Sequence, residues 1–164
     1  MSEVSSPVSD LLEREGIDYE WVEIPLDPER KPIRSLEELV AARGLSPAQI
    51  VRSLVFRTGS GGFVLLAAPA TARADWGKLR KHTGERRLTM AESEQVLQAT
   101  GYPVGAVPPV ALPGDLRVLV DEGIFAHERV FIGAGVLGWS LSLRSADLRR
   151  LLARAELGAF TKSA

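Results

Sequence analysis

The sequence contains no cysteine among its 164 residues. This absence excludes disulfide bonds, a thiolate nucleophile and a zinc–thiolate centre, and it fits an intracellular protein. The only two histidines, His82 and His127, are isolated from one another, and no serine occupies a G-x-S-x-G turn. The sequence therefore argues against a hydrolase of the Ser-His-Asp type.

Long hydrophobic runs are also missing, and the N-terminus lacks the apolar region of a signal peptide. No P-loop and no His/Asp/Glu cluster with metal-ligand spacing occurs. The pattern Gly133-x-Gly135-x-x-Gly138 matches a dinucleotide fingerprint literally, but it precedes a strand where that site needs a helix. We therefore expect a cytoplasmic protein with no membrane partner, no metal and no cofactor.

The net charge of −1 excludes a surface that attracts nucleic acid as a whole, so any polynucleotide contact must be local. Hydrophobic residues make up 45% of the chain and charged residues 25%, as in ordinary globular domains. The length suits one domain with a substantial core. We expect that domain over residues 8–158, with flexible termini at 1–7 and 159–164.

Hydrophobic periodicity and capping residues predict an α+β fold with a mixed or largely antiparallel sheet. Capping boxes are expected at Ser35/Glu38 and Thr89/Glu92, and Ser145 is expected to cap the last helix. The predicted helices cover 8–15, 35–43, 76–83, 89–99 and 146–155, and the predicted strands cover 19–24, 50–58, 63–68, 87–89, 116–121, 129–132 and 139–143.

The segment from Thr100 to Pro109 holds two glycines and three prolines in ten residues. Such a segment cannot continue a helix or a central strand, so it predicts a stiff loop. Its backbone amides could lie close to a ligand. The alternative is a structural turn that ends the preceding helix.

Two charged residues stand out on predicted strands. Period-two alternation places Arg52 in one row with Ile50, Leu54 and Phe56, which are apolar. The arginine could bind a ligand, or it could reach water or pair with a carboxylate. Asp121 ends another strand, where an aspartate is either functional or a turn former.

The segment between Arg73 and Arg87 is locally basic. Its cations are opposed only by Asp75 and Glu85. It is either a solvated helix face or a patch that follows phosphates; the candidate phosphate contacts are Lys78, Arg80, Lys81 and Arg86.

Several motifs in a fixed order resemble the YbaK/ProX family, whose domains are related to the editing insertion of prolyl-tRNA synthetase. The resemblance extends from about Leu11 to Leu152. The family's K-T-L strand is similar to Arg52-Ser53-Leu54, its T-G-Y-x-x-G-G-x-x-P loop to Thr100–Pro109, and its glycine turn to Gly133-Ala134-Gly135. A strand ending in aspartate is similar to Val118–Asp121, and a D-x-x-K helix to 75–84.

The resemblance implies a YbaK-type domain over 8–158 with a barrel-like sheet flanked by helices. It also implies hydrolysis of the ester that joins a mischarged amino acid to the 3′ end of tRNA, by water or a substrate group and without a protein nucleophile. The partners implied are the aminoacyl-tRNA acceptor end and, as a second candidate, prolyl-tRNA synthetase, for a monomer or weak homodimer. The catalytic candidates are Arg52, Gly101 and Asp121, and the substrate-binding candidates are Ser53, Thr100, Tyr102, Gly105, Ala106, Pro108 and Gly133.

The chain departs from the family pattern at four positions. Arg52 replaces a lysine, Ala106 and Ala111 replace glycines, and Ile24 stands where some members have tyrosine. Arginine keeps the charge but differs from lysine in shape and hydration. Two alternatives therefore stay open: a binding module for tRNA or a synthetase without turnover, and a hydrolase or binder for a small aminoacyl or nucleotide compound.

Overall fold

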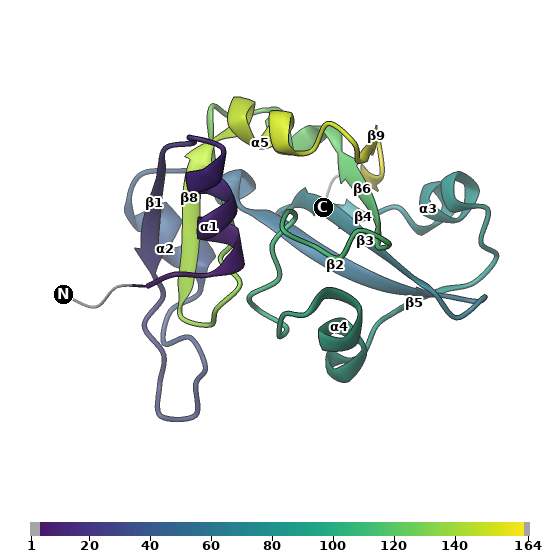
Figure 1. Ribbon diagram of the computed structural model, residues 1–164, viewed down its shortest axis with the longest axis horizontal. Helices are drawn as coiled ribbons and strands as arrows, with labels where there is room; N and C mark the ends of the chain where they lie inside the picture. Colours follow the sequence, from purple (N-terminus) through teal and green to yellow (C-terminus); the bar gives the residue numbers. More distant parts are fainter. Residues whose placement is uncertain (1–3, 163–164) are drawn as a thin grey trace.

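The computed structural model describes residues 4–162 (Figure 1). These residues form five α-helices, two short 3-10 helices and ten strands. In chain order they are α1 (Pro7–Arg14), β1 (Tyr19–Glu23), α2 (Leu36–Ala42), η1 (Pro47–Gln49), β2 (Val51–Thr58), β3 (Phe63–Pro69), β4 (Arg73–Ala74), α3 (Trp76–Thr83), β5 (Leu88–Met90), α4 (Ser93–Thr100), β6 (Arg117–Asp121), η2 (Glu122–Phe125), β7 (Arg129–Gly133), β8 (Trp139–Arg144), α5 (Ser145–Leu151), β9 (Glu156–Gly158) and β10 (Thr161–Lys162).

The strands form two main sheets that lie side by side in Figure 1. One has the order β1-β8-β7 and is antiparallel, and the other has the order β5-β2-β3-β6-β9. Only the β3–β6 and β6–β9 pairs of the larger sheet are parallel, and β10 pairs with β4 separately. The predicted α+β class with a mixed, largely antiparallel sheet is confirmed. The sheets stay open, so the description "barrel-like" is too strong.

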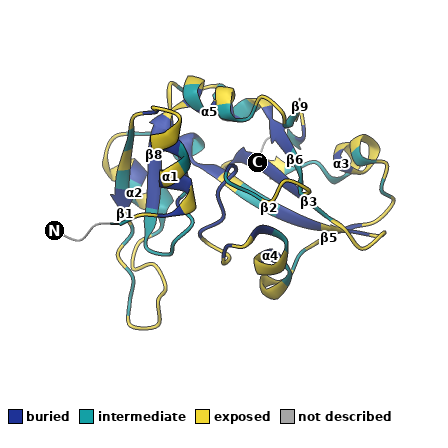
Figure 2. Ribbon diagram, viewed as in Figure 1, coloured by how far each residue is buried: buried dark blue, intermediate teal, exposed yellow. Residues whose placement is uncertain are grey.

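The larger sheet is covered on both faces, which explains why β3 is a continuous apolar run rather than an alternating one. Residues 64–69 of β3 are all buried (Figure 2). On one face Leu66 packs with Phe56 and Leu79, and on the other Leu65 packs with Val55. The predicted alternation of β2 is therefore confirmed: Leu54 and Phe56 pack on one face of the sheet, and Val55 packs on the other.

Helix boundaries differ from the prediction chiefly at the starts of α4 and α5, and α5 also ends at Leu151 instead of at the expected residue 155. The helix expected from Thr89 begins at Ser93, with Glu92 as its N-cap, because Leu88–Met90 instead pairs with β2. Ser145 is the first residue of α5 rather than its cap, and it donates its backbone N–H to the Glu128 carbonyl oxygen. In both places strand pairing replaces the local capping pattern.

The packed domain is longer at both ends than the expected range of 8–158. Ser6 is buried and accepts the N–H groups of Val8 and Ser9, which caps α1. At the other end Phe160 is only 3% exposed, and β10 follows it. The remaining residues expected to be flexible, 1–3 and 163–164, lie outside the described residues.

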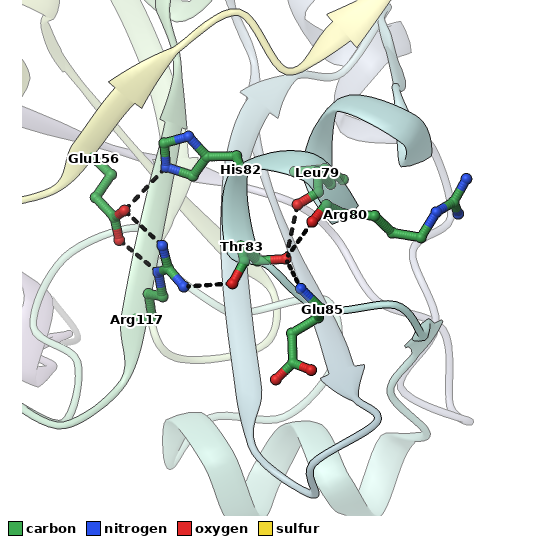
Figure 3. Close-up of polar contacts among 7 residues, drawn as sticks. All are labelled: Leu79, Arg80, His82, Thr83, Glu85, Arg117 and Glu156. Carbon is green, nitrogen blue, oxygen red and sulfur yellow. Dashed lines mark hydrogen bonds and ion pairs between the residues drawn. The ribbon is translucent and has the colours of Figure 1, made fainter.

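A polar cluster holds α3 against the β6–β9 edge (Figure 3). The Glu156 carboxylate accepts hydrogen bonds from Arg117 Nε at 2.7 Å and Nη2 at 2.9 Å, and it lies 3.0 Å from His82 Nε2. The hydrogen bonds from Arg117 lower the pKa of Glu156 to about 2, with a smaller contribution from His82 and an opposing one from partial burial. The ionised carboxylate thus joins three elements.

Replacing Glu156 by glutamine is expected to remove a pH-dependent part of the stability. Because the folded-state pKa of Glu156 lies below its ordinary value of 4.5, its contribution is fully present above that pH and is lost as the pH falls toward about 2. The difference in unfolding free energy between wild type and Glu156→Gln should therefore shrink over this range in urea titrations. The exposed Glu128→Gln serves as control; an equal pH dependence in both variants would contradict the assignment.

Candidate functional site

A cavity of about 450 Å³ lies at the open edge of β2. Strand β5 pairs only with Phe56–Thr58, so the stretch Val51–Val55 has no strand partner on that side among the described residues. The walls come from α2, the segment before α4, the 100–109 loop and the ends of β7 and β8. They include Leu36, Glu37, Met90, Ala91, Val104, Gly105, Val107, Ile132, Gly133 and Trp139.

Arg52 lies at the rim of this cavity and is paired with a residue that the sequence did not single out. Its Nη2 donates to Glu37 Oε1 at 2.9 Å, and both side chains remain partly exposed, at 49% and 40%. An exposed pair of this kind adds little stability. Glu37 also lines the cavity. In the sequence it resembles any acidic residue in the first turn of a helix, a position that the helix dipole favours.

Ser53 brings an unused hydroxyl to the cavity wall. Its side chain lies on the β2 face opposite to that of Arg52, and the residue lines the cavity. Among the described residues, Ser53 Oγ is the one buried side-chain polar atom without a hydrogen-bond partner. A buried hydroxyl of this kind is costly; it has both a donor and an acceptor to offer, but its oxygen is inaccessible to solvent, so a ligand in the cavity reaches it only after a local shift of the wall.

The start of the 100–109 loop is built by internal hydrogen bonds. Gly101 ends α4 with a left-handed φ of 84°, which glycine adopts without a Cβ clash. Thr100 Oγ1 donates to the Val96 carbonyl oxygen at 2.7 Å and accepts the Tyr102 N–H at 3.1 Å. The Tyr102 hydroxyl donates to the Ala111 carbonyl oxygen at 2.6 Å, and burial raises the pKa of Tyr102. The sequence predicts Thr100, Gly101 and Tyr102 as site residues, but none of the three lines the cavity.

The middle of the loop rests on the end of β7. A Cβ on Gly133 would lie 2.3 Å from the Val107 carbonyl oxygen, so only glycine allows this approach. The Gly135 N–H donates to the Ala106 carbonyl oxygen at 2.8 Å. Ala106 and Pro108 are buried away from the cavity, whereas Gly105 is exposed to it. Gly105 has a φ of 94°, and its N–H donates to no acceptor among the described residues.

Asp121 lies elsewhere. It is 4% exposed, and its Oδ1 accepts the Phe160 N–H at 2.8 Å while its Oδ2 accepts the Gly123 N–H at 3.0 Å. It does not line the cavity. The structure therefore does not bring Asp121 together with Arg52, and its contacts fit the turn-forming alternative.

The basic residues of the 73–87 segment also lie outside the cavity. All four candidate phosphate contacts are exposed on α3 or just after it: Lys78, Arg80, Lys81 and Arg86. Figure 1 shows α3 at the end of the larger sheet that is distant from α2. These residues could contact only a partner that extends well beyond the cavity.

The described part of the chain has neither a metal site nor a membrane-spanning helix. Over residues 4–162, no group of three or more acidic or histidine side chains could hold a metal ion. Within the same residues, none of the helices has the length and apolarity that a membrane span requires.

Substituting Gly133 by alanine is expected to displace the 100–109 loop. The new Cβ would overlap the Val107 carbonyl, so the unfolding free energy should fall by about 3 kcal/mol or more. Gly114→Ala is the matched control, because nothing lies within 4 Å of its Cβ position. Denaturant titration of both variants tests this; equal stabilities would show that the loop does not depend on the contact.

Asp121→Asn is expected to lower the free energy of unfolding, because the Asp121 carboxylate accepts two backbone N–H groups. The amide replaces one carboxylate oxygen that accepts a backbone N–H by an NH₂ donor, which should cost about 2 kcal/mol. The exposed Asp115→Asn should cost almost nothing. Unfolding titrations of both variants test this; equal stabilities would show that the two hydrogen bonds to the Asp121 carboxylate do not stabilise the fold.

Comparison with known proteins shows the family of the chain. The family model described as "Aminoacyl-tRNA editing domain" matches residues 30–151. The multifunctional Ser/Thr-tRNA deacylase ProXp-y of Escherichia coli K12 is 29% identical over 158 residues, which cover 94% of this chain and 90% of the deacylase.

A synthetase sequence and a solved structure are also similar to this chain. Proline–tRNA ligase of Thermosipho melanesiensis is 30% identical over 101 residues, which are 62% of this chain. This chain spans only 18% of that ligase, about a fifth of its length. The crystal structure of a candidate trans-editing enzyme for prolyl-tRNA synthetase superposes with a TM-score of 0.77 at 28% identity and covers 96% of each chain. The chain belongs to the aminoacyl-tRNA editing domain family.

Proposed function

We propose that the protein is an aminoacyl-tRNA deacylase, which hydrolyses the ester of mischarged tRNA in trans and so serves translation quality control. The observation that carries this proposal is the meeting of Arg52, Glu37, the unpaired Ser53 hydroxyl and the Gly105 amide around one cavity. Membership of the editing-domain family supports it, as does the near full-length similarity to a Ser/Thr-tRNA deacylase.

The cavity offers complementary groups to an aminoacyl ester. Glu37 is the one carboxylate on its wall and can receive the α-ammonium group of the amino acid. Arg52 donates to Glu37 through one nitrogen and keeps other N–H groups for a carbonyl or phosphate oxygen. Ser53 can bind a polar atom of the amino acid side chain or the ester, while the apolar walls hold the rest.

The reaction requires little chemical assistance because an aminoacyl ester is already activated. Water adds to the ester carbonyl carbon, the bond to the ribose oxygen breaks, and that oxygen leaves with a proton from the water. Positioning the ester and stabilising the oxyanion by a preorganised amide lower the barrier. The Gly105 N–H, which donates to no acceptor in the described part of the chain, is the amide that we assign to this task.

The other residues named from the sequence have supporting roles in this proposal. Gly133 admits the loop, and Thr100, Gly101, Tyr102, Ala106 and Pro108 shape it. Asp121 holds the segment around Phe160. We further propose a cytoplasmic monomer or weak homodimer that binds the tRNA acceptor end, with prolyl-tRNA synthetase as an additional partner.

The deacylation test uses tRNA-Pro charged with serine, threonine or alanine and tRNA-Ala charged with serine or threonine, with correctly charged tRNA-Pro and tRNA-Ala as controls. Wild type should hydrolyse at least one mischarged species. Arg52→Ala should lower kcat/KM about ten-fold or more, because it removes the charged donor at the rim.

Ser53→Ala should lower kcat/KM on the same substrate while the free energy of unfolding rises by about 1 kcal/mol, since an unsatisfied hydroxyl is removed.

Arg52→Lys decides between turnover and binding alone. If wild type binds tRNA but hydrolyses no species, and Arg52→Lys creates activity, the proposal is wrong and the protein is a binding module of the same family. A variant whose activity stays within about three-fold of wild type would show that charge at this position matters more than shape.

A further inference from the structure

A second hollow meets the cavity at β2. It has a volume of about 440 Å³ and lies on the sheet face that carries Leu54 and Ala68. Arg52 and Leu54 line both hollows. They can do so because this part of β2 has no strand partner on its outer side among the described residues. The second hollow continues to β4, β10 and the start of α3, and we call it the β4–β10 groove.

The charges of the β4–β10 groove have one sign. Arg52, Arg73 and Lys162 line it, and no carboxylate does. Arg73 and Lys162 are direct partners in the antiparallel β4–β10 pair, so their side chains share a face. Neither forms an ion pair with a carboxylate in the described part of the chain.

Like charges directly opposite each other in a sheet are destabilising. Both side chains are exposed, so solvent screens the repulsion and its cost is small, and a single carboxylate at either position would remove it. Local costs of this kind occur at functional sites, where a ligand compensates them. An anion between Arg73 and Lys162 would supply the missing charge.

The rest of the groove is apolar and includes one aromatic ring. Small residues of β3, of β4 and of the segment between these strands line it, among them Ala68, Ala70 and Ala74. Trp76 lines the groove and contacts Phe56 edge-on, with ring centroids 5.0 Å apart. Phe56 is buried and so holds the indole in place. Cations beside a fixed aromatic ring are the combination that binds single-stranded nucleic acid.

We propose that the β4–β10 groove binds the single-stranded 3′ end of the tRNA, with its phosphodiesters against Arg73 and Lys162. The ester then crosses the open edge of β2 at Arg52, and the amino acid enters the cavity. This inference rests on the proposed function for the identity of the polynucleotide. The groove itself is assigned from its charges and their placement.

The test removes the paired charges with Arg73→Gln/Lys162→Gln. KM for aminoacyl-tRNA should rise about ten-fold, with kcat within about two-fold of wild type, since the contacts position the substrate. The slope of log affinity against log salt should fall by about 1.4, from about 0.7 for each lost phosphate contact. The melting temperature should not decrease, because a like-charge pair is removed. Hydrolysis of an aminoacyl-adenosine ester, which has no phosphate, should be unchanged.

Arg14→Gln/Arg154→Gln is the matched control, because it removes the same charge from exposed positions outside the groove. Fluorescence anisotropy with a short oligonucleotide ending in CCA gives a readout that is independent of turnover. If both variant pairs weaken binding equally, or if the groove pair hydrolyses and binds like wild type, the groove assignment is overturned while deacylation stands. If wild type hydrolyses no ester yet binds the oligonucleotide through Arg73 and Lys162, the groove stands and the deacylase proposal fails. Absence of both binding and hydrolysis overturns both.

Discussion

The close approach of the 100–109 loop to the end of β7 is the contact on which the candidate site depends. Two carbonyl groups of the loop, those of Ala106 and Val107, occupy the space that a side chain on Gly133 would fill. The hydrogen bond from Gly135 to Ala106 fixes the same contact from the next turn. As a result Gly105 lines the cavity at the open edge of β2, and the loop forms one of the cavity walls.

The buried polar groups away from the cavity have hydrogen-bond partners, whereas two polar groups at the cavity have none in the described part of the chain. Thr100, Tyr102 and Asp121 are buried and fully engaged with backbone partners, so they stabilise the loop and the C-terminal segment. At the cavity, by contrast, neither the Ser53 hydroxyl nor the Gly105 amide has a hydrogen-bond partner within residues 4–162. The Ser53 hydroxyl is buried, so leaving it unpaired costs about 1–3 kcal/mol, whereas water reaches the amide of the exposed Gly105 and no such cost arises there. Retaining unpaired groups beside a cavity is the pattern expected of a site prepared for a ligand.

The open edge of β2 gives Arg52 its position. An unpaired strand edge invites pairing with another chain, and proteins usually cover it. Here α2, the loop and the β4–β10 groove surround it, so the edge forms the floor of a site instead of an aggregation surface. Arginine suits this junction because its planar group can contact Glu37 and still present further donors, which the compact ammonium of lysine does less readily.

The sequence by itself determined the α+β class, the strands β2 and β3 with their buried faces, and the family motifs at Arg52, Thr100–Pro109 and Gly133, because these depend on periodicity and on residue type. It placed the start of α4 wrongly, since a capping pattern at Thr89 competes with pairing to β2. Only the tertiary structure decided that Glu37 faces Arg52, that Asp121 holds Phe160, and that Arg73 stands opposite Lys162. Each of these pairs joins residues distant in the chain, and the chemistry of a side chain does not specify which distant partner the fold will bring to it.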